Sequence, residues 1–408
     1  MKVYSGGGFI GRGFESALGA QMVRALGDGQ ASALIVEGET GIGKSRLVQG
    51  IVDDARSRGM TVLHGQAHPF ERTRPFGVVA AALDLRRRST DPRRAAIEGL
   101  LTGGGVGTAP AGGDLQHRVV EEIIDLVETL CAEGPALLVA EDIHWADSAS
   151  LLVISSLVRR IPLSPLLVVV TVRPAPADPD VLRLLDDLSA GGARTIRLGP
   201  LGPDDVVTLA SSVLGGTPGP ALTGLLARAG GNPLWVMSLL RSLEEEGMLR
   251  GAEGRVEATT SDLPSSLKDL VVRRLQGLPP ATLDLLRIAA VLGDAVSIRA
   301  LATVVRRPPA EVARRLEAAF NNQLLDVDGD RVAFRHQLVH DAIYQHIPAP
   351  TRRVLHRDAA AALMAAGAPR LDVADHLILG SERGDDEVIG WLRGAAEEAS
   401  ARAPSVMV

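Results

Sequence analysis

The sequence of 408 residues predicts an α/β fold in its first half and a mostly helical second half. Three observations carry this prediction. An apolar strand, a glycine-rich loop and a helical pattern follow one another over residues 32–52. A second apolar strand, residues 136–140, ends in two acids, and strands alternate with helical patterns from residue 32 to residue 200. This alternation is typical of a parallel sheet with helices on both faces.

The glycine-rich loop, residues 38–45, has the sequence GETGIGKS, which matches the phosphate-binding pattern G-x-x-x-x-G-K-[ST]. In such a loop, backbone N–H groups surround phosphate oxygens, and the next helix adds its positive dipole end. We expect Lys44 to reach the β- and γ-phosphates and the Ser45 hydroxyl to bind Mg²⁺. A chance match is rare here, because the chain has 44 glycines but only three lysines. The pattern predicts a P-loop NTPase core that binds ATP or ADP with Mg²⁺. Further nucleotide contacts are expected at Gly38, Gly41, Gly43 and Arg46.

Residues 136–142, ALLVAED, predict the second half of this site. An apolar run of this kind is typical of a central parallel strand, and ligands bind at the carboxyl end of such strands. We expect Glu141 to hold Mg²⁺ through water and Asp142 to orient or deprotonate the attacking water. The reverse assignment of the two acids stays open.

A third apolar strand, residues 166–172, ends at Arg173. If this strand neighbours the other two, Arg173 lies beside the γ-phosphate and reports its presence. The alternative is an ordinary surface arginine at a strand end.

After residue 200 the strands are expected to stop. Residues 203–250 predict helices broken by the glycine pairs at 215–216 and 230–231. Residues 264–347 predict short helices and then a hairpin, because an Asp-Gly turn separates two apolar alternations in 324–334. Helices followed by a hairpin wing suggest a winged helix, and alanine-rich residues 351–408 suggest the start of a helical solenoid. The predicted domains are an ATPase core (1–200), a helical lid (201–263), a winged helix (264–348) and the start of a tetratricopeptide-like sensor region (349–408).

Composition and charge exclude some classes of function for this chain. The formal net charge of −6 argues against a large nucleic-acid-binding surface. The single cysteine, Cys131, lies on the apolar stripe of a helical pattern and is expected in the core. No signal peptide and no apolar run of about 18 residues is present, so a cytoplasmic location is expected.

His336 and His340 have helical spacing but lack the glutamate of a zinc-protease helix. We expect His336 to be a phosphate contact and His340 to be a surface residue.

Several short motifs occur in a fixed order along the chain. They are FIGR (9–12), the loop at 38–45, EDIHWAD (141–147), TVR (171–173), GNP (231–233) and FRH (334–336). Together they resemble the large ATP-binding regulators of the LuxR type, which are signal-transduction ATPases with numerous domains among the AAA+-like P-loop proteins. The resemblance implies a nucleotide-controlled switch, in which an inducer releases an ADP-bound closed form, ATP replaces ADP, and slow hydrolysis resets the protein.

The resemblance also implies residue roles outside the loop. Ile10, Gly11 and Arg12 are expected near adenine. Pro233 is expected to pack on the base, and His336 to touch the β-phosphate in the resting state. The sequence departs from the family pattern at two positions where relatives carry an acid, and these are Gly13 and Gln337.

Relatives of this type continue through helical repeats to a DNA-binding helix-turn-helix, so the chain is expected to be cut short at residue 408. The resemblance therefore implies an inducer or partner protein at the C-terminal helical region and nucleotide-dependent self-association. The lack of a long apolar run and the acidic net charge predict no membrane contact and no direct DNA binding by this chain. Two alternatives remain: a replication-initiator-like AAA+ ATPase that binds DNA through the winged helix, and a P-loop kinase or transferase.

Overall fold

A computed structural model describes residues 9–68, 75–85, 89, 91–101, 112–160, 164–174, 178–252, 254–293, 295–322, 324–329, 331–368, 370–381 and 388–394. The chain divides into two compact units, Met1–Asp205 and Val206–Val408. Each unit is described by itself.

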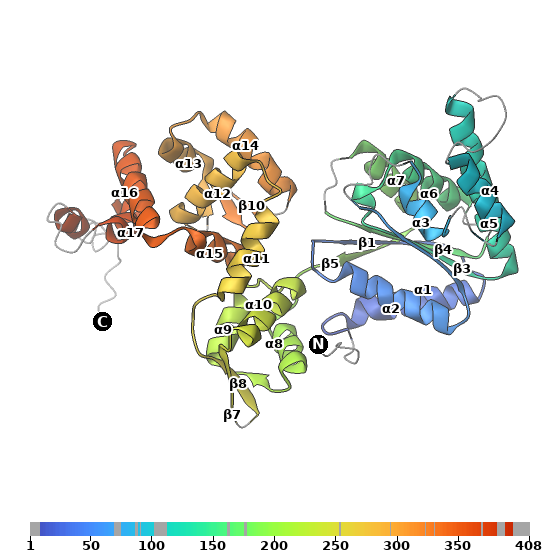
Figure 1. Cartoon of the computed structure of the whole chain (residues 1–408), viewed down its shortest axis with the longest axis horizontal. Coiled ribbons are helices and arrows are strands. Elements are labelled where there is room, and N and C mark those ends of the chain that lie inside the picture. The colour runs from blue at the N-terminus through green and yellow to red at the C-terminus, as the bar shows by residue number, and fades with distance from the viewer. Residues whose placement is uncertain are drawn as a thin grey trace, which may run out of the picture. The chain divides into compact units, whose positions relative to one another are not determined.

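The first unit is built on a parallel sheet (Figure 1). Among the described residues it has five strands in the order β2-β3-β4-β1-β5. All neighbouring strands pair in parallel, and β3 and β4 are buried at every residue, as continuous apolar runs require. The predicted parallel sheet is therefore confirmed. The strands are β1 (Ser32–Gly38), β2 (Thr61–Gln66), β3 (Ala136–Glu141), β4 (Leu166–Val172) and β5 (Arg194–Leu198).

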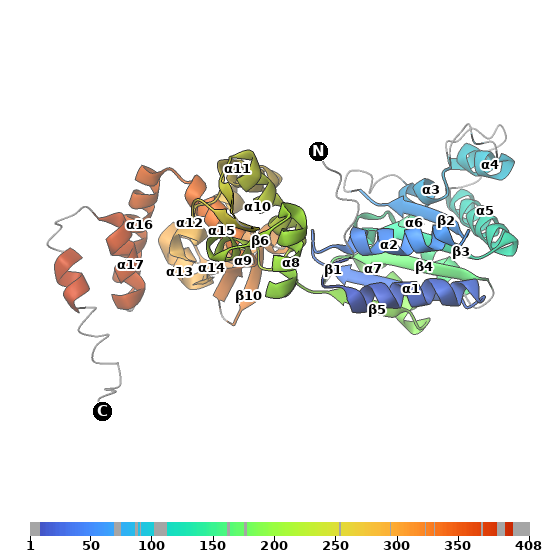
Figure 2. The ribbon, with the colours of Figure 1, turned by 90° about the horizontal axis from the view of Figure 1, so that it is seen from below.

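Helices cover both faces of this sheet (Figures 1 and 2). The side chains of each strand alternate between two cores: Leu34 and Val36 pack with α1 and α2, whereas Ala33 and Ile35 pack with the helices of the opposite face. Cys131 lies in this second core as expected, and burial raises the pKa of its thiol to about 11. The helices are α1 (Gly13–Gly27), α2 (Lys44–Ser57), α3 (Gly77–Ala82), α4 (Pro92–Leu101), α5 (Gly112–Glu133), α6 (Ser148–Arg160) and α7 (Pro179–Ala190).

The segment after residue 200 begins with α8 (Pro203–Leu214), α9 (Pro220–Ala227) and α10 (Pro233–Glu245). The helix breaks fall at the predicted glycines, and Gly215, Gly230 and Gly231 all have positive φ. The expectation that strands stop at residue 200 is wrong. A small sheet of β6 (Thr217–Pro218), β8 (Arg255–Ala258) and β7 (Leu249–Ala252) follows. Its strands have only two to four residues, which is too short for an alternating pattern to predict a strand.

The predicted helices and hairpin of residues 264–347 are present. The hairpin joins β10 (Leu325–Asp328) to β11 (Arg331–Phe334) in antiparallel register, and Gly329 in its turn has φ +61°. β9 (Ala295–Ser297) pairs with β11 and completes this small sheet. The helices before the hairpin are α11 (Ser265–Leu275), α12 (Pro280–Leu292), α13 (Ile298–Val305) and α14 (Pro309–Asn321).

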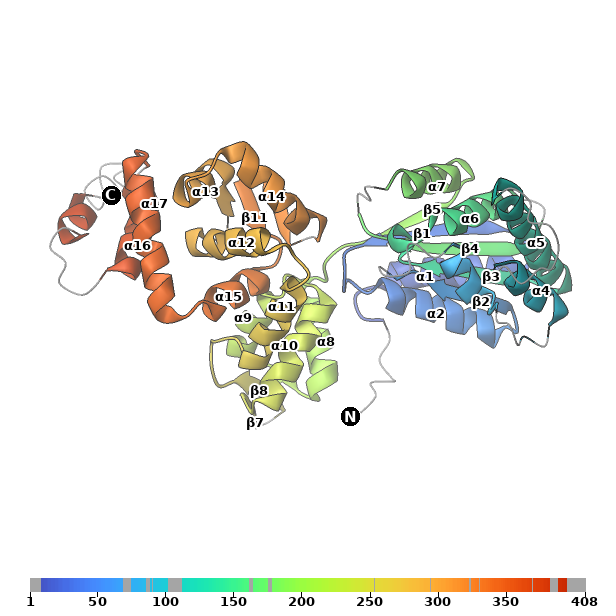
Figure 3. The ribbon, with the colours of Figure 1, turned by 45° about the horizontal axis from the view of Figure 1, so that its top comes forward.

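In the described part of the chain the hairpin is followed by α15 (Gln337–His346), α16 (Ala349–Ala365), α17 (Arg370–Gly380) and a helical stretch at residues 388–394. α16 and α17 lie side by side (Figure 3), which suits the predicted start of a helical solenoid. Residues 395–408 of that segment lie outside the described residues. The domain divisions at 263/264 and 348/349 stay predictions. In the part of the chain that the structure describes, no helix is both long enough and apolar enough to cross a bilayer.

Candidate nucleotide site

The glycine-rich loop connects β1 directly to α2. Gly41 has φ +80° and Gly43 has φ +110°, a backbone conformation that strains any residue with a Cβ. Ile42 between them is only 1% exposed, so its side chain fixes the loop to the core. The loop therefore has a fixed shape whose tight turns depend on glycine.

Lys44, the first residue of α2, is buried against this loop. Its Nζ donates hydrogen bonds to the carbonyl oxygens of Gly38 at 2.8 Å and Glu39 at 3.0 Å. Burial lowers the pKa of Lys44, and the charges of Asp142 and Glu141 act against that shift. Ser45 and Arg46 follow in the first turn of α2 and are exposed, so both can be reached by a ligand at the helix N-terminus.

Glu141 ends β3 and is buried. Its Oε1 lies 2.8 Å from Nε2 of His64 on the neighbouring strand β2. Its Oε2 is also buried, and in the part of the chain that the structure describes this oxygen has no hydrogen-bond partner. A buried carboxylate oxygen in this state is costly unless a ligand satisfies it. A water molecule bound to Mg²⁺ would do so, and carboxylate and hydroxyl oxygens are the donors that Mg²⁺ prefers. The residues present therefore fit the metal.

Asp142 begins the turn after β3 and has φ +55°, which is unusual for a residue with a side chain. Its backbone N–H donates to Oγ1 of Thr171 at 2.7 Å, and its Oδ2 accepts a hydrogen bond of 3.1 Å from Gln66. These bonds come from β4 and β2, the two strands that flank β3. The half-buried carboxylate is thus held at the carboxyl edge of the sheet.

Arg173 follows β4, and β4 lies between β1 and β3. The strand that precedes Arg173 therefore neighbours the other two strands, as its predicted role beside the γ-phosphate requires. Burial lowers the pKa of the Arg173 guanidinium, while the charge of Asp142 opposes the shift; the Arg173 charge in turn lowers the pKa of Lys44. The fold therefore brings Lys44, Glu141, Asp142 and Arg173 together at one edge of the sheet. Their individual roles stay predictions.

Several residues around this cluster were missed by the sequence analysis. His64 and Gln66 lie on β2, which no phosphate-site motif covers. Asp147, the last residue of the EDIHWAD stretch, accepts hydrogen bonds from the backbone N–H groups of Phe76 and Gly77 and from Ser150. It ties the turn after β3 to α3 and α6. In the sequence, Asp147 stands out only as the last residue of the EDIHWAD motif.

The N-terminal segment that was expected near adenine packs against the loop. A Cβ placed on Gly43 would lie 3.5 Å from the ring of Phe9. Arg12 is buried and donates to the carbonyl oxygen of Gly199. Its other terminal nitrogen lies 3.5 Å from the carboxylate of Glu15, so an acid two residues beyond Gly13 pairs with this arginine. Contact of Ile10, Gly11 and Arg12 with a base stays a prediction.

Pro233 and His336 belong to the second unit. Pro233 is the first residue of α10, behind the N-cap Asn232, whose side chain accepts a 3.0 Å hydrogen bond from Leu234 N–H. His336 is buried at the start of α15, and its ring meets Trp235 of α10 edge-on at 6.5 Å. Its side chain does not cap α15. Pro233 and His336 are thus linked by α10, because Pro233 begins this helix and His336 packs against its Trp235. Contact of either residue with a nucleotide stays a prediction.

The expectation that His340 is a surface residue is wrong. Its side chain is only 12% exposed. Nε2 lies 3.0 Å from the carbonyl oxygen of Ala290, and the ring stacks on Tyr344. The helical spacing gave no sign of this, because the partner in α12 is distant in the sequence.

Comparison with known proteins agrees with this geometry. Residues 8–169 match the family model described as an AAA ATPase domain. An uncharacterized protein of Rhizobium meliloti (strain 1021) is 27% identical over 389 residues, which are 86% of this chain and 36% of that protein. The chain thus spans about a third of the length of that relative.

Solved structures are similar at low sequence identity. The ORC2 protein of Aeropyrum pernix, solved as ADPNP–ADP complexes, has a TM-score of 0.52 at 14% identity over 87% of this chain and 95% of its own. A signal-transduction ATPase with numerous domains from Pyrococcus horikoshii covers 93% of this chain and 50% of its own, with a TM-score of 0.30 at 15% identity. The likeness to ORC2 concerns the fold. The family match includes the glycine-rich loop and the acids at the end of β3, so residues 8–169 of this chain resemble an AAA ATPase domain.

Proposed function

We propose that the chain is an ATP-binding regulatory switch that cycles between an ADP-bound resting form and an ATP-bound active form. In this proposal, slow hydrolysis of ATP resets the switch, and the chain is the ATPase portion of a signal-responsive transcriptional regulator. The observation that carries the proposal is the meeting of Lys44, Glu141, Asp142 and Arg173 at the carboxyl edge of the sheet. It is supported by the depressed pKa values of Lys44 and Arg173, each caused first by burial.

Each residue has a distinct task in the proposed cycle. The loop N–H groups and Lys44 bind the phosphates, and Ser45 and Glu141 hold Mg²⁺, which neutralises charge on the phosphoryl oxygens. Asp142 orients the attacking water and accepts its proton. Arg173 contacts the γ-phosphate, so its surroundings differ between the ATP and ADP forms.

The regulatory part of the proposal rests on the second unit. His336 and Pro233 contact ADP in the resting form, and their release accompanies exchange to ATP. The C-terminal helices receive an inducer or a partner protein, and the ATP form self-associates. These steps are supported by the motif order of the sequence.

The proposal is tested by identifying the nucleotide that copurifies with the 408-residue chain and by following phosphate release from MgATP. We expect bound ADP, and hydrolysis far slower than the 1–100 s⁻¹ that is typical of kinases. Rapid transfer of the phosphoryl group to an added acceptor in place of water would instead support the kinase alternative. A chain that copurifies without nucleotide and does not bind ADP or ATP would contradict the proposal.

One observation favours a second candidate. The hairpin wing suits a replication-initiator-like ATPase that binds DNA. The net charge of −6 argues against it. Gel retardation of duplex DNA by the purified chain at physiological salt decides between them, because the switch proposal predicts no sequence-specific retardation.

A further inference from the structure

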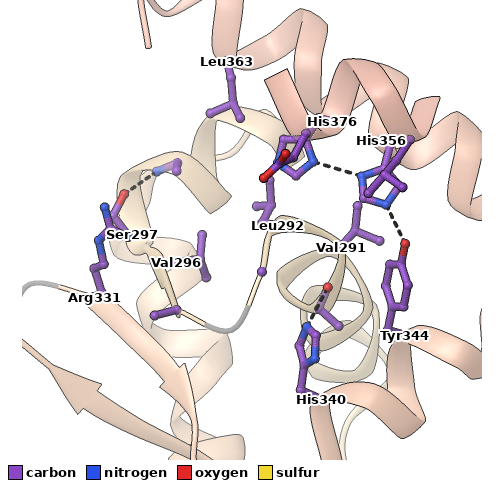
Figure 4. Close-up of a pocket in the computed structure, with 16 residues that line it drawn as sticks. Val291, Leu292, Val296, Ser297, Arg331, His340, Tyr344, His356, Leu363 and His376 are labelled. Carbon is purple, nitrogen blue, oxygen red and sulfur yellow. Dashed lines mark hydrogen bonds between the residues drawn. The ribbon is translucent and has the colours of Figure 1, made fainter. Parts of the chain in front are cut away.

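The second unit contains a cavity of about 550 Å³ (Figure 4). It is open to solvent on one side and is lined by residues of α12, β9, α13, β11, α15, α16 and α17. Apolar side chains, among them Val291, Val296 and Leu363, form much of its wall. Its size is that of a small-molecule site, and its wall combines apolar side chains with polar ones. None of its lining residues belongs to the nucleotide site.

A chain of hydrogen bonds ends at this cavity. The hydroxyl of Tyr344 lies 2.9 Å from Nε2 of His356, and Nδ1 of His356 lies 2.9 Å from Nδ1 of His376 (Figure 4). His356 and His376 are 3% and 7% exposed. Because Nδ1 of His376 faces His356, its Nε2, on the other side of the ring, is the atom that a ligand in the cavity can reach.

This chain of hydrogen bonds can adapt to a donor or to an acceptor. When Tyr344 donates to His356, His356 donates to His376, and Nε2–H of His376 is a donor. In the reverse arrangement His376 donates to His356, His356 donates to the oxygen of Tyr344, and Nε2 of His376 is an acceptor. A hydroxyl group can use both arrangements, and a carbonyl oxygen can use the first.

The charges around the cavity favour a neutral ligand group at this point. Burial lowers the pKa of His356 to about 4, with the charges of His376 and Arg352 adding to the shift, and burial also lowers the pKa of His376. Both rings are therefore neutral at pH 7. Arg331 and Asp375 also line the cavity, but they are exposed and of opposite sign. A charged group at His376 would lose its hydration without gaining a fixed counter-charge.

We propose that this cavity binds an uncharged small organic molecule, whose hydroxyl or carbonyl group hydrogen-bonds Nε2 of His376 and whose apolar body contacts Val291, Val296 and Leu363. The site is separate from the nucleotide site, and the inference does not depend on the proposed ATPase function.

Cyclohexanol tests the proposal as a probe, with cyclohexanecarboxylate as its charged counterpart. Both are titrated against the full 408-residue chain at pH 7.5 and followed by ligand-observed NMR. We expect cyclohexanol to bind with a Kd of about 1–10 mM, the range of a very small ligand. The carboxylate is expected to bind at least tenfold more weakly.

Three variants assign the binding to the cavity. His376→Phe keeps a ring of similar size but removes the hydrogen bond, and it should weaken cyclohexanol binding about tenfold. Ala300→Leu places three more carbons in the cavity from α13 without changing a histidine, and it should weaken binding about fivefold or more. His346→Phe makes the same exchange at an exposed position of α15 and should change nothing.

Circular dichroism and the melting temperature establish that each variant is folded, and Ala300→Leu decides alone if His376→Phe does not fold. The proposal is overturned if cyclohexanol shows no binding up to about 50 mM, well above the range expected for such a probe. It is also overturned if binding is the same in Ala300→Leu, or if the carboxylate binds more tightly than the alcohol. The last result would mean that Arg331 selects an anion.

Discussion

The guanidinium carbon of Arg173 lies 5.4 Å from the ring centre of Trp145. Trp145 is the last residue of the short 3₁₀ helix Ile143–Trp145, which directly follows Glu141, the end of β3, and Asp142. A cation over an aromatic face is attracted to it and loses side-chain freedom. The turn that carries Asp142 therefore also positions the arginine of the neighbouring strand β4, which links two motifs that are separate in the sequence.

Arg173→Gln should lower the affinity for ATP about tenfold or more and leave the affinity for ADP nearly unchanged, because only ATP has the γ-phosphate that Arg173 is proposed to contact. Trp145→Leu should give a smaller effect in the same direction, about two- to fivefold, because it removes the cation–π contact. Calorimetric titration with each nucleotide measures both. Arg183→Gln, in an exposed arginine of α7, is the control. An unchanged ATP-to-ADP affinity ratio in Arg173→Gln would remove Arg173 from the site.

Asp142→Asn should retain ATP binding and lower the rate of hydrolysis at least 100-fold, because an amide cannot accept the proton of the attacking water. The amide oxygen can still accept the hydrogen bond of Gln66, so the turn is preserved. Glu141→Gln should instead weaken the Mg²⁺-dependent part of ATP binding. Phosphate release and Mg²⁺ titrations compare the two variants. Hydrolysis by Asp142→Asn at the parental rate, with loss in Glu141→Gln, would reverse the assignment of the two acids.

His336→Ala should speed ADP release about tenfold while the fold stays intact. A charge-assisted hydrogen bond to the β-phosphate contributes about 1.5–3 kcal/mol to the closed ADP form, and the variant loses it. The off-rate of a fluorescent ADP analogue measures this effect, and His346→Ala, at an exposed histidine of α15, is the control. If the off-rate and the melting temperature both match the parent, His336 has a structural role against Trp235.

Much of the first unit could be predicted from the sequence, whereas contacts between distant segments could not. β1, β3 and β4 each contain a continuous apolar run, so these runs and the loop between β1 and α2 indicate the sheet and the phosphate site. The order of the strands then places Arg173 at the same edge as the acids. His64 had no such signal, because its partner Glu141 is 77 residues away on another strand.

In the second unit, too, local structure could be predicted from the sequence, whereas contacts between distant segments could not. The Asp-Gly turn indicated the hairpin, but β7 and β8 are four-residue strands without a fully buried residue, and they pair with each other. The contacts of His340, and the pair His356 and His376, bring separate helices together. Helical spacing places a residue on a face of its own helix, but it does not show which distant helix packs there.

His356 should make the protein less stable in acid. Its pKa is lowered from 6.5 to about 4 in the folded chain, so the unfolded chain binds more protons between these pH values. The free energy of unfolding therefore falls as the pH drops from 6.5 toward 4, by about 2 kcal/mol. His376 and Arg352 oppose protonation of His356, and Asp375 favours protonation of His376.

Urea unfolding followed by circular dichroism at pH 7.5, 6 and 5 measures this dependence. His356→Gln cannot take up the proton, so its free energy of unfolding should vary less with pH than that of the parent. His346→Gln should keep the parental slope. Equal slopes in the parent and His356→Gln would show that His356 does not control acid stability.

Calorimetric titration of Lys44→Ala with ADP and ATP tests the central claim most directly. The substitution removes the cation of the loop and two hydrogen bonds to its carbonyl oxygens. We expect affinity for both nucleotides to fall at least 100-fold, as for a lost charge-assisted contact to phosphate, while the chain stays folded. Lys268→Ala in α11 should bind like the parent. Parental affinity in a folded Lys44→Ala variant would contradict nucleotide binding by this loop.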